Sequence, residues 1–587
     1  MRESLVCFRS LPMRPMLPFL TLALGACGGD SGVTGTTSRQ PCGSASVVAL
    51  AALQSATIDC TTGTVIQLTG GGAHYLVVPE FATSNVTDKA TSYVIADSDA
   101  VPAPVGQVIA SRAPFASISA SAARGTSLAP GALQRQFDAL LRAKARNGVS
   151  TGQWTRPTAS TGSSAARSSM ASFAVIPPAG SIRTFKVINT FNATNPTYAT
   201  VNAKLLFIGT NTLVYVDTMA PANGFNTSQL NAFGQQIDQT FYTIDVNAFG
   251  PPSDVDGNGR VIVLLSPVVN SLSPSAQCAT QGYIAGFFFG LDLSGAGNSN
   301  SNQGEIYYGL VPDPNGTVSC AHSVSTVASI APGTFLHELQ HMINFSQHVV
   351  VHGGNSEEGW LDEGLSIVAQ ELGSEYYEQR FPPPTGRTNP NQLLPDSAEG
   401  FIADQFVESY DWLLDPDTTT LTLHSDSDGG LQWRAADWLF LHWLGDQQGA
   451  ALYKRLEESS TTGTDNIASA AGESFQSLFG DFGLSVYTDS IPGIPKSSIP
   501  QNNKFTTRTL RTIFQAVANS GGGGGSFPIT LKTLTGQVTG SMVPGAVTYY
   551  EIFTAPSVAT TTLRFAPSTG STFQSSLHPQ VSVFRLP

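Results

Sequence analysis

The segment His337-Glu338-Leu339-Gln340-His341 constrains the fold more than any other part of this chain. Residues four apart lie on one face of a helix, so a helical segment lets His337 and His341 reach one metal ion, with Glu338 beside them. We expect this helix to begin at Gly333 and Thr334, with Thr334 as its N-cap. Apolar residues around the motif would bury the helix in a core; they are Phe335, Leu336, Leu339 and Ile343.

A third metal ligand is expected in the segment Trp360-Leu-Asp-Glu-Gly364. Glu363 is the candidate, and the other downstream acids are Glu357, Glu358 and Glu371. Three protein ligands with one open position are typical of catalytic zinc, which lowers the pKa of its water and polarises a carbonyl. Glu338 is then placed to act as general base. The competing interpretation is a core helix with two incidental histidines.

The N-terminus has the pattern of an export signal. Arg2, Arg9 and Arg14 precede the apolar run 17–24, which is too short to span a membrane as a helix. Leu24-Gly-Ala-Cys27 resembles a bacterial lipobox, although ordinary signal cleavage nearby is the alternative. We predict a lipoprotein signal peptide over 1–26, a lipid on Cys27 and a tether over 27–40. Gly28 carries no signal for inner-membrane retention, so the predicted location is the outer membrane or the extracellular space.

Four cysteines besides Cys7 and Cys27 remain for pairing in the oxidising compartment that export predicts. Four cysteines allow three pairings. We predict Cys42–Cys60 and Cys278–Cys320, because each pair lies within one predicted domain. Metal binding by these sulfurs is disfavoured, because none has CxxC spacing.

The chain is predicted to contain three folded parts. Short β-rich runs predict a domain over 41–150, which ends in a helix from about Ala132 with Gly148 as its cap. A Ser/Thr/Ala-rich linker over 151–178 leads to a catalytic domain over 179–515, with a hairpin around Gly209 and a buried strand at Val261–Leu265. Five glycines then precede a small β domain over 527–587. The region before about 175 is alternatively a removable propeptide.

Several segments resemble known zinc peptidases. The segment 360–364 is similar to Trp-Leu-Asn-Glu-Gly, the third-ligand segment of zinc aminopeptidases related to thermolysin, the gluzincins. Across roughly residues 180–460 the chain resembles the hyicolysin family of bacterial secreted neutral metallopeptidases, and the segments that carry this likeness are Phe249–Leu265, Gly282-Tyr283, Glu305–Tyr308 and Phe440–Gly449.

This resemblance implies an α+β fold and a set of site residues. The catalytic domain would be thermolysin-like, with a mixed sheet, the HExxH helix and a helical subdomain, flanked by the small N- and C-terminal β domains. Zinc would be bound by His337, His341 and Glu363, with Glu338 as base. Ile367 departs from the pattern, because thermolysin-like enzymes place there an aspartate that orients a ligand histidine. The resemblance also implies a Tyr or His that stabilises the oxyanion; the candidates are Tyr376, Tyr377, Tyr410, His424 and His442.

Two further segments have a functional and a structural interpretation. Asp254, Asp256 and Asn258 resemble the start of a calcium loop, but Leu265 replaces its acidic twelfth ligand, and a tight turn explains the same residues. The strand Glu305–Leu310 is either an edge strand that pairs with an extended peptide or an ordinary core strand.

Together these features predict an exported, lipid-anchored zinc metalloendopeptidase that acts on protein or peptide substrates. The alternative is a catalytically inactive surface-binding lipoprotein that retains the fold. An exopeptidase is disfavoured, because the chain lacks a Gly-x-Met-Glu-Asn type segment that would hold a substrate amine. The net charge of −13 and the lack of a basic block argue against nucleic acid as a partner.

Overall fold

The structure is a computed structural model that describes most of the chain after the N-terminal segment. The described residues are 39–43, 47–84, 89–98, 100–101, 131–154, 176–190, 192, 195–293, 297–381, 393–395, 397–422, 431–520 and 527–587. All of them belong to one compact unit, Ser38–Pro587. The predicted signal peptide, the lipid site at Cys27 and the candidate His424 lie outside the described residues.

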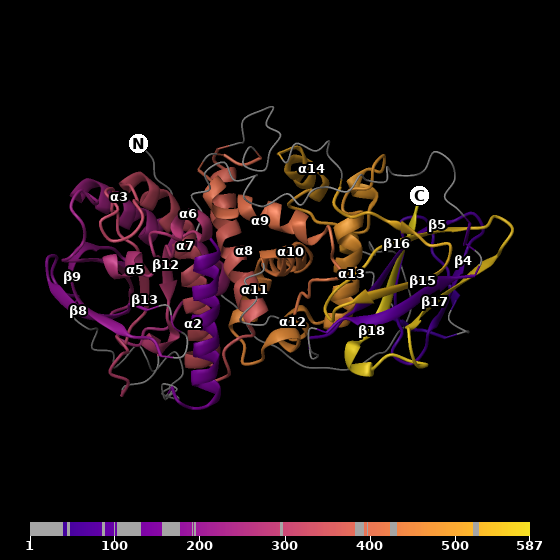
Figure 1. Ribbon diagram of the computed structural model, residues 1–587, viewed down its shortest axis with the longest axis horizontal. Coiled ribbons are helices and arrows are strands. Elements are labelled where there is room, and N and C mark those ends of the chain that lie inside the picture. Colours follow the sequence, from indigo (N-terminus) through magenta and orange to yellow (C-terminus); the bar gives the residue numbers. More distant parts are fainter. Residues whose placement is uncertain are drawn as a thin grey trace, which may run out of the picture. The chain divides into compact units, whose positions relative to one another are not determined.

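A six-stranded mixed sheet forms one part of the α+β fold (Figure 1). Its strands, in spatial order, are β12 (Gly286–Phe288), β13 (Ile306–Gly309), β11 (Val261–Leu265), β10 (Thr212–Asp217), β9 (Tyr198–Ile208) and β8 (Ile182–Ile188). The predicted buried strand is β11, which runs parallel to both neighbours with every side chain buried. Such an uninterrupted apolar run is typical of a strand covered on both faces. The predicted hairpin is confirmed, because β9 and β10 pair antiparallel on either side of Gly209.

The two edge strands of this sheet are β12 and β8. β13 pairs with β11 on one side and with β12 on the other, so it is an interior strand. The core-strand interpretation of Glu305–Leu310 is therefore confirmed and the edge-strand interpretation is wrong. The residues 289–305 separate β12 from β13 in the chain, and the short apolar sequence of β12 did not indicate that it would form an edge of the sheet.

The HExxH motif lies on α7 (Val324–Phe345), which continues into the π-helical turn η4 (Ser346–Val351). The predicted start at Gly333 and Thr334 is wrong. The helix begins at Val324, because the Ser323 hydroxyl accepts the backbone N–H of Thr326 as an N-cap. Pro332 lies inside the helix and removes one backbone hydrogen bond, but the buried turns on both sides keep the helix continuous.

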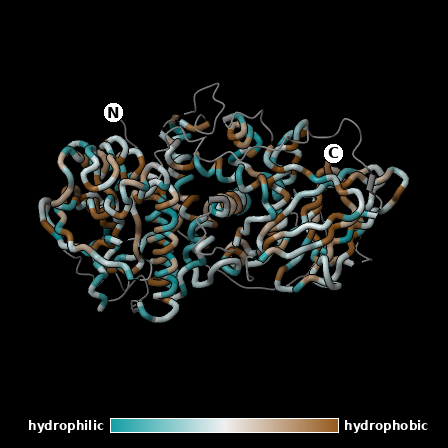
Figure 2. The backbone as a smooth tube through the Cα atoms, in the orientation of Figure 1, coloured by the Kyte–Doolittle hydropathy of each residue, from teal (hydrophilic) through white to brown (hydrophobic). Residues whose placement is uncertain are grey.

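Helices after α7 form the predicted helical part. They are α8 (Gly359–Glu378), α9 (Glu399–Trp412), α10 (Leu431–Gln448), α11 (Ala451–Glu457), α12 (Gly463–Ala471), α13 (Phe475–Thr488) and α14 (Leu510–Ser520). α10 runs through the interior, and Figure 2 shows hydrophobic and hydrophilic residues interspersed along it. Gly364 lets α10 pack closely on α8, since a Cβ there would lie 2.7 Å from a Leu441 methyl carbon.

The β strands from the two ends of the chain form one structure of two sheets. The larger sheet contains β1 (Gln40–Pro41), β3 (Ser55–Asp59), β18 (Pro579–Leu586), β5 (His74–Phe81), β16 (Tyr550–Thr554) and β14 (Lys532–Thr533), with β7 (Ala100–Val101) beside β16. The smaller contains β15 (Gly536–Met542), β6 (Thr91–Asp97), β17 (Thr560–Pro567), β4 (Val65–Thr69) and β2 (Val47–Val48). Figure 1 shows indigo strands from the N-terminal segment side by side with yellow strands from the C-terminal segment in these two sheets.

The expectation of two separate flanking β domains is corrected by this pairing. β18 lies between β3 and β5, and β6 lies between β15 and β17, so each segment fills sheet positions beside strands of the other. Either segment alone would leave strands with unpaired backbone edges.

α2 (Ala132–Ser150) also departs from the predicted domains. It was assigned to the N-terminal β-rich domain, yet its side chains pack against β12 and α7, for example Phe137 on Phe287. Gly148 lies within α2 and does not cap it, and a Cβ there would lie 2.5 Å from the Trp154 ring. This close contact with the ring explains the glycine.

Both predicted disulfides, Cys42–Cys60 and Cys278–Cys320, are present. The remaining short helices are α3 (Thr227–Gln236), η2 (Ile237–Phe241), α4 (Tyr242–Phe249), α5 (Pro267–Ser271), α6 (Cys278–Gln281), η3 (Gly290–Leu293), η6 (Lys496–Ser498), η7 (Gln501–Asn503) and η8 (Ser575–Leu577). Within the described ranges, every helix is too short or too polar to cross a bilayer.

Candidate metal centre

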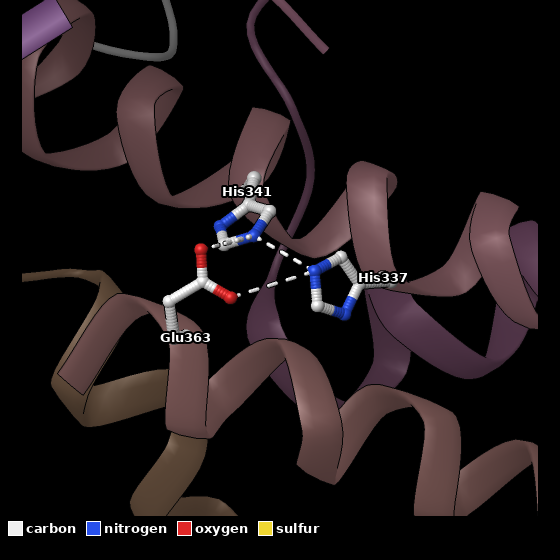
Figure 3. Close-up of side chains that lie close together, drawn as sticks. All are labelled: His337, His341 and Glu363. Carbon is white, nitrogen blue, oxygen red and sulfur yellow. Dashed lines mark hydrogen bonds and ion pairs between the residues drawn. The ribbon is translucent and has the colours of Figure 1, made fainter. Parts of the chain in front are cut away.

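The three residues predicted to bind metal lie together between α7 and α8 (Figure 3). The Nε2 atoms of His337 and His341 are 3.2 Å apart. Oε2 of Glu363 is 3.6 Å from Nε2 of His337, and its Oε1 is 3.7 Å from Nε2 of His341. All three side chains are buried. We call them the His-His-Glu cluster.

The outer nitrogen of each imidazole is held by an acceptor on α8. Nδ1 of His341 donates to Oδ1 of Asp362 at 2.7 Å, and Nδ1 of His337 donates to Oε1 of Gln370 at 3.2 Å. These contacts place the ring protons on Nδ1 and leave the Nε2 lone pairs facing one another. Ile367 stands where an orienting aspartate was expected, and its side chain cannot accept a hydrogen bond. Asp362 and Gln370, on the same helix as Glu363, orient the two histidines instead.

The charges in the cluster fit a bound cation. Burial lowers the pKa of His337 and of His341 well below the usual value, so both rings are neutral. Burial opposes ionisation of Glu363, but the charge of Arg434 outweighs it and lowers the pKa of Glu363 to about 2. Two neutral nitrogen acceptors only 3.2 Å apart repel each other unless a cation lies between them. Two imidazoles and a carboxylate are a donor set that zinc accepts.

Glu338 lies beside the cluster, on the side of the six-stranded sheet. Its Oε2 accepts the backbone N–H of Phe288 at 2.8 Å and Nη2 of Arg142 at 2.7 Å. Its Oε1 is buried without a hydrogen-bond partner among the described residues. Burial, and next the neighbouring Asp138, raise the pKa of Glu338 well above its usual range. A carboxylate of raised pKa accepts a proton readily near neutral pH.

Sequence reasoning missed three charged residues at this centre. Arg434 of α10 donates from Nη2 to Oε2 of Glu363 and, at 3.3 Å, to Nε2 of His337. Asp138 and Arg142 come from α2, and Asp138, His337 and Glu338 each place one atom within 4.8 Å of the others. Arg434 stands out in the sequence as the one arginine in the mostly apolar segment Trp433–Leu444, and this could have marked it as a buried charged residue. Nothing local marks Asp138 or Arg142, because their role depends on where α2 packs.

The predicted oxyanion candidates have other partners. Tyr377 bonds to Gln236 and His442 bonds to Glu371 and Thr507. Tyr376 stacks on the guanidinium of Arg380, and Tyr410 packs edge-on against Phe514. Arg434 is thus the cationic donor that reaches the His-His-Glu cluster.

The predicted calcium residues lie in a turn before β11, where Glu305 joins them. Asp254, Asp256 and Glu305 each place one carboxylate oxygen within 4.8 Å of the others. Glu305 is buried; its Oε1 accepts from Ser253 and Val255, while its Oε2 has no partner among the described residues. Asn258 instead donates to Asp256 and accepts the backbone N–H of Arg260.

Comparison with known proteins adds one distant relationship. No protein-family model matches the chain. A stretch of 240 residues is 27% identical to the neutral metalloprotease ShpI of Staphylococcus hyicus and covers 39% of this chain and 49% of that protein. The chain therefore spans about half the length of this curated relative. The similarity supports a relationship to metallopeptidases.

Proposed function

We propose that this protein is a zinc metalloendopeptidase in which His337, His341 and Glu363 bind the metal. The observation that carries the proposal is the pair of buried imidazoles whose Nε2 atoms lie 3.2 Å apart beside the Glu363 carboxylate. When bound there, zinc supplies Lewis acidity toward a scissile carbonyl and an ionisable water. The similarity to a neutral metalloprotease supports the same activity.

Side chains around the cluster would transfer the proton and stabilise the oxyanion. Glu338 accepts the proton of the attacking water at Oε1, the oxygen without a protein partner, and then transfers it to the leaving amine. The Phe288 N–H holds the other oxygen of Glu338 in place. Arg434 donates toward the cluster from α10 and stabilises the developing oxyanion, in place of the expected Tyr or His.

The substrate is an extended segment of a protein or peptide. β12 is the sheet edge beside Glu338, and an extended chain can add to such an edge through main-chain hydrogen bonds. Internal cleavage is proposed, since the sequence lacks an amine-holding segment. Export, with a lipid on Cys27 as an outer-membrane anchor, remains part of the proposal on sequence grounds.

Glu338→Gln separates catalysis from metal binding. Zinc content and casein cleavage are measured for the wild-type protein and this variant, with Glu458→Gln on the exposed end of α11 as matched control. We expect all three to bind zinc, a chelator to abolish cleavage, and Glu338→Gln to lose at least about 100-fold in rate. Full activity of Glu338→Gln would refute its assignment as base. A zinc-loaded protein that cleaves casein neither as the wild type nor as any variant would instead favour the surface-binding function.

We also propose a calcium site at Asp254 and Asp256, with Glu305 as the acidic ligand missing from the loop. Calcium prefers carboxylate oxygens, and the unpartnered buried oxygen of Glu305 supports this assignment. Added calcium should raise the melting temperature of the wild-type protein but not that of Asp254→Asn. An equal rise in both proteins would show that calcium acts elsewhere.

A further inference from the structure

α2 lies along the edge strand where a peptide substrate would bind. The side-chain amide of Gln134 accepts the backbone N–H of Ala285 at 2.7 Å and donates to the carbonyl of Gly286 at 2.8 Å. Ala285 directly precedes β12 and Gly286 is its first residue, so this amide occupies backbone groups at the start of the edge strand. Gln134 therefore occupies hydrogen-bonding positions on β12 that an extended peptide needs.

One helical turn further along α2, a second polar residue lies near His337 and Glu338. Asp138 places a carboxylate atom within 4.8 Å of atoms of His337 and Glu338. Its Oδ1 accepts from Gln134 at 2.7 Å, and its Oδ2 is buried without a hydrogen-bond partner among the described residues. A buried carboxylate oxygen without a donor is costly unless a cation is present.

A third polar residue, another turn along, holds the proposed base. Arg142 donates to Oε2 of Glu338 at 2.7 Å and to the carbonyl of Phe288 at 3.3 Å. Gln134, Asp138 and Arg142 are spaced by four, so they share one face of α2. This face thus bonds to the edge strand and to the base, and it places Asp138 near His337.

One small cavity beside the centre lies where α2 approaches His341 and Asp362, away from Asp138 and Glu338. The cavity between Arg142 of α2, His341 of α7 and Asp362 of α8 has a volume of about 10 Å³. That volume holds roughly one water molecule. Figure 1 shows α2 running beside β12 and α7.

We propose that α2 is a built-in inhibitor whose Asp138 is a fourth ligand of the metal. The Asp138 carboxylate occupies the open coordination position, Arg142 neutralises Glu338, and Gln134 blocks the edge strand. Catalysis requires α2 to leave this groove, so that water replaces Asp138 and substrate replaces Gln134. The inference rests on the proposed metal centre and extends it to regulation.

Cobalt substitution of the full chain tests the fourth ligand without relying on activity. The visible absorption of bound Co²⁺ and its titration with azide are compared for the wild-type protein, Asp138→Asn and the control Gln136→Ala on the exposed face of α2. We expect Asp138→Asn to change the absorption bands and to bind azide at least about 10-fold more tightly, because the competent state is no longer a minor population. Its zinc form should also cleave casein faster than wild type.

A second variant keeps the test decisive if Asp138→Asn folds poorly. Gln134→Ala leaves the metal cluster intact but removes both bonds to β12, so azide binding and casein cleavage should rise in the same direction. Identical spectra and azide affinities in wild type, Asp138→Asn and Gln134→Ala would overturn the inhibitor proposal and leave the metal centre standing. Failure of the wild-type protein to bind Co²⁺ would overturn the metal centre itself.

Discussion

The contact between Asp362 and His341 gives a quantitative prediction about metal affinity. Asp362→Ala removes the acceptor that holds Nδ1 of His341 at 2.7 Å in a fully buried site. A hydrogen bond to a charged group contributes about 1.5–3 kcal/mol. At about 1.4 kcal/mol per decade, this corresponds to a roughly 10- to 100-fold loss of zinc affinity. Asp362→Asn retains an acceptor oxygen without the charge, so its loss should be smaller.

The measurement is a zinc titration against a competing chelator. Burial raises the pKa of Asp362 to about 6, so a buffer near pH 8 keeps the wild-type carboxylate ionised. Asp465→Asn, on the exposed surface of α12, is the matched control and should bind zinc as the wild type does. Equal affinities for wild type, Asp362→Ala and Asp362→Asn would refute the role of Asp362 in orienting His341.

Three further predictions concern stability. Burial opposes ionisation of Glu371, but His442 and Arg508 lower its pKa from 4.5 to about 2. The ionised carboxylate therefore stabilises the fold fully above pH 4.5, and this stabilisation is lost as the pH falls toward 2. In urea unfolding, Glu371→Gln should weaken the dependence of the unfolding free energy on pH in this range, and an unchanged dependence would contradict the prediction. Deleting 527–587 removes both neighbours of β5, so hydrogen exchange of β5 should accelerate, whereas retained protection would show that the N-terminal strands fold alone. Gly148→Ala should lower the free energy of unfolding in urea by about 1–3 kcal/mol, because the added Cβ clashes with the Trp154 ring. Alanine favours a helix more than glycine does, so a more stable variant would show that there is no clash.

Local sequence patterns predicted the elements whose signals lie within a few residues. The HExxH spacing placed His337 and His341 on one helical face, and the apolar run Val261–Leu265 became the central strand. The start of α7 was misplaced, because Gly333 and Thr334 look like a helix start in isolation while the capping residue is Ser323. Tertiary packing of the turns around Pro332 overrides that local signal.

The sequence by itself suggested the donor set of the proposed metal centre, because helical periodicity groups His337 with His341 and the resemblance of Trp360–Gly364 to a known third-ligand segment singles out Glu363. Only the tertiary structure decided what surrounds this cluster. Arg434 and Asp138 come from segments about 100 and 200 residues away in the chain, and β12 from about 50 residues away. The two β segments at the ends of the chain pair across more than 400 residues. Such contacts arise from burial and from hydrogen bonding between distant segments, which no local pattern of residues encodes.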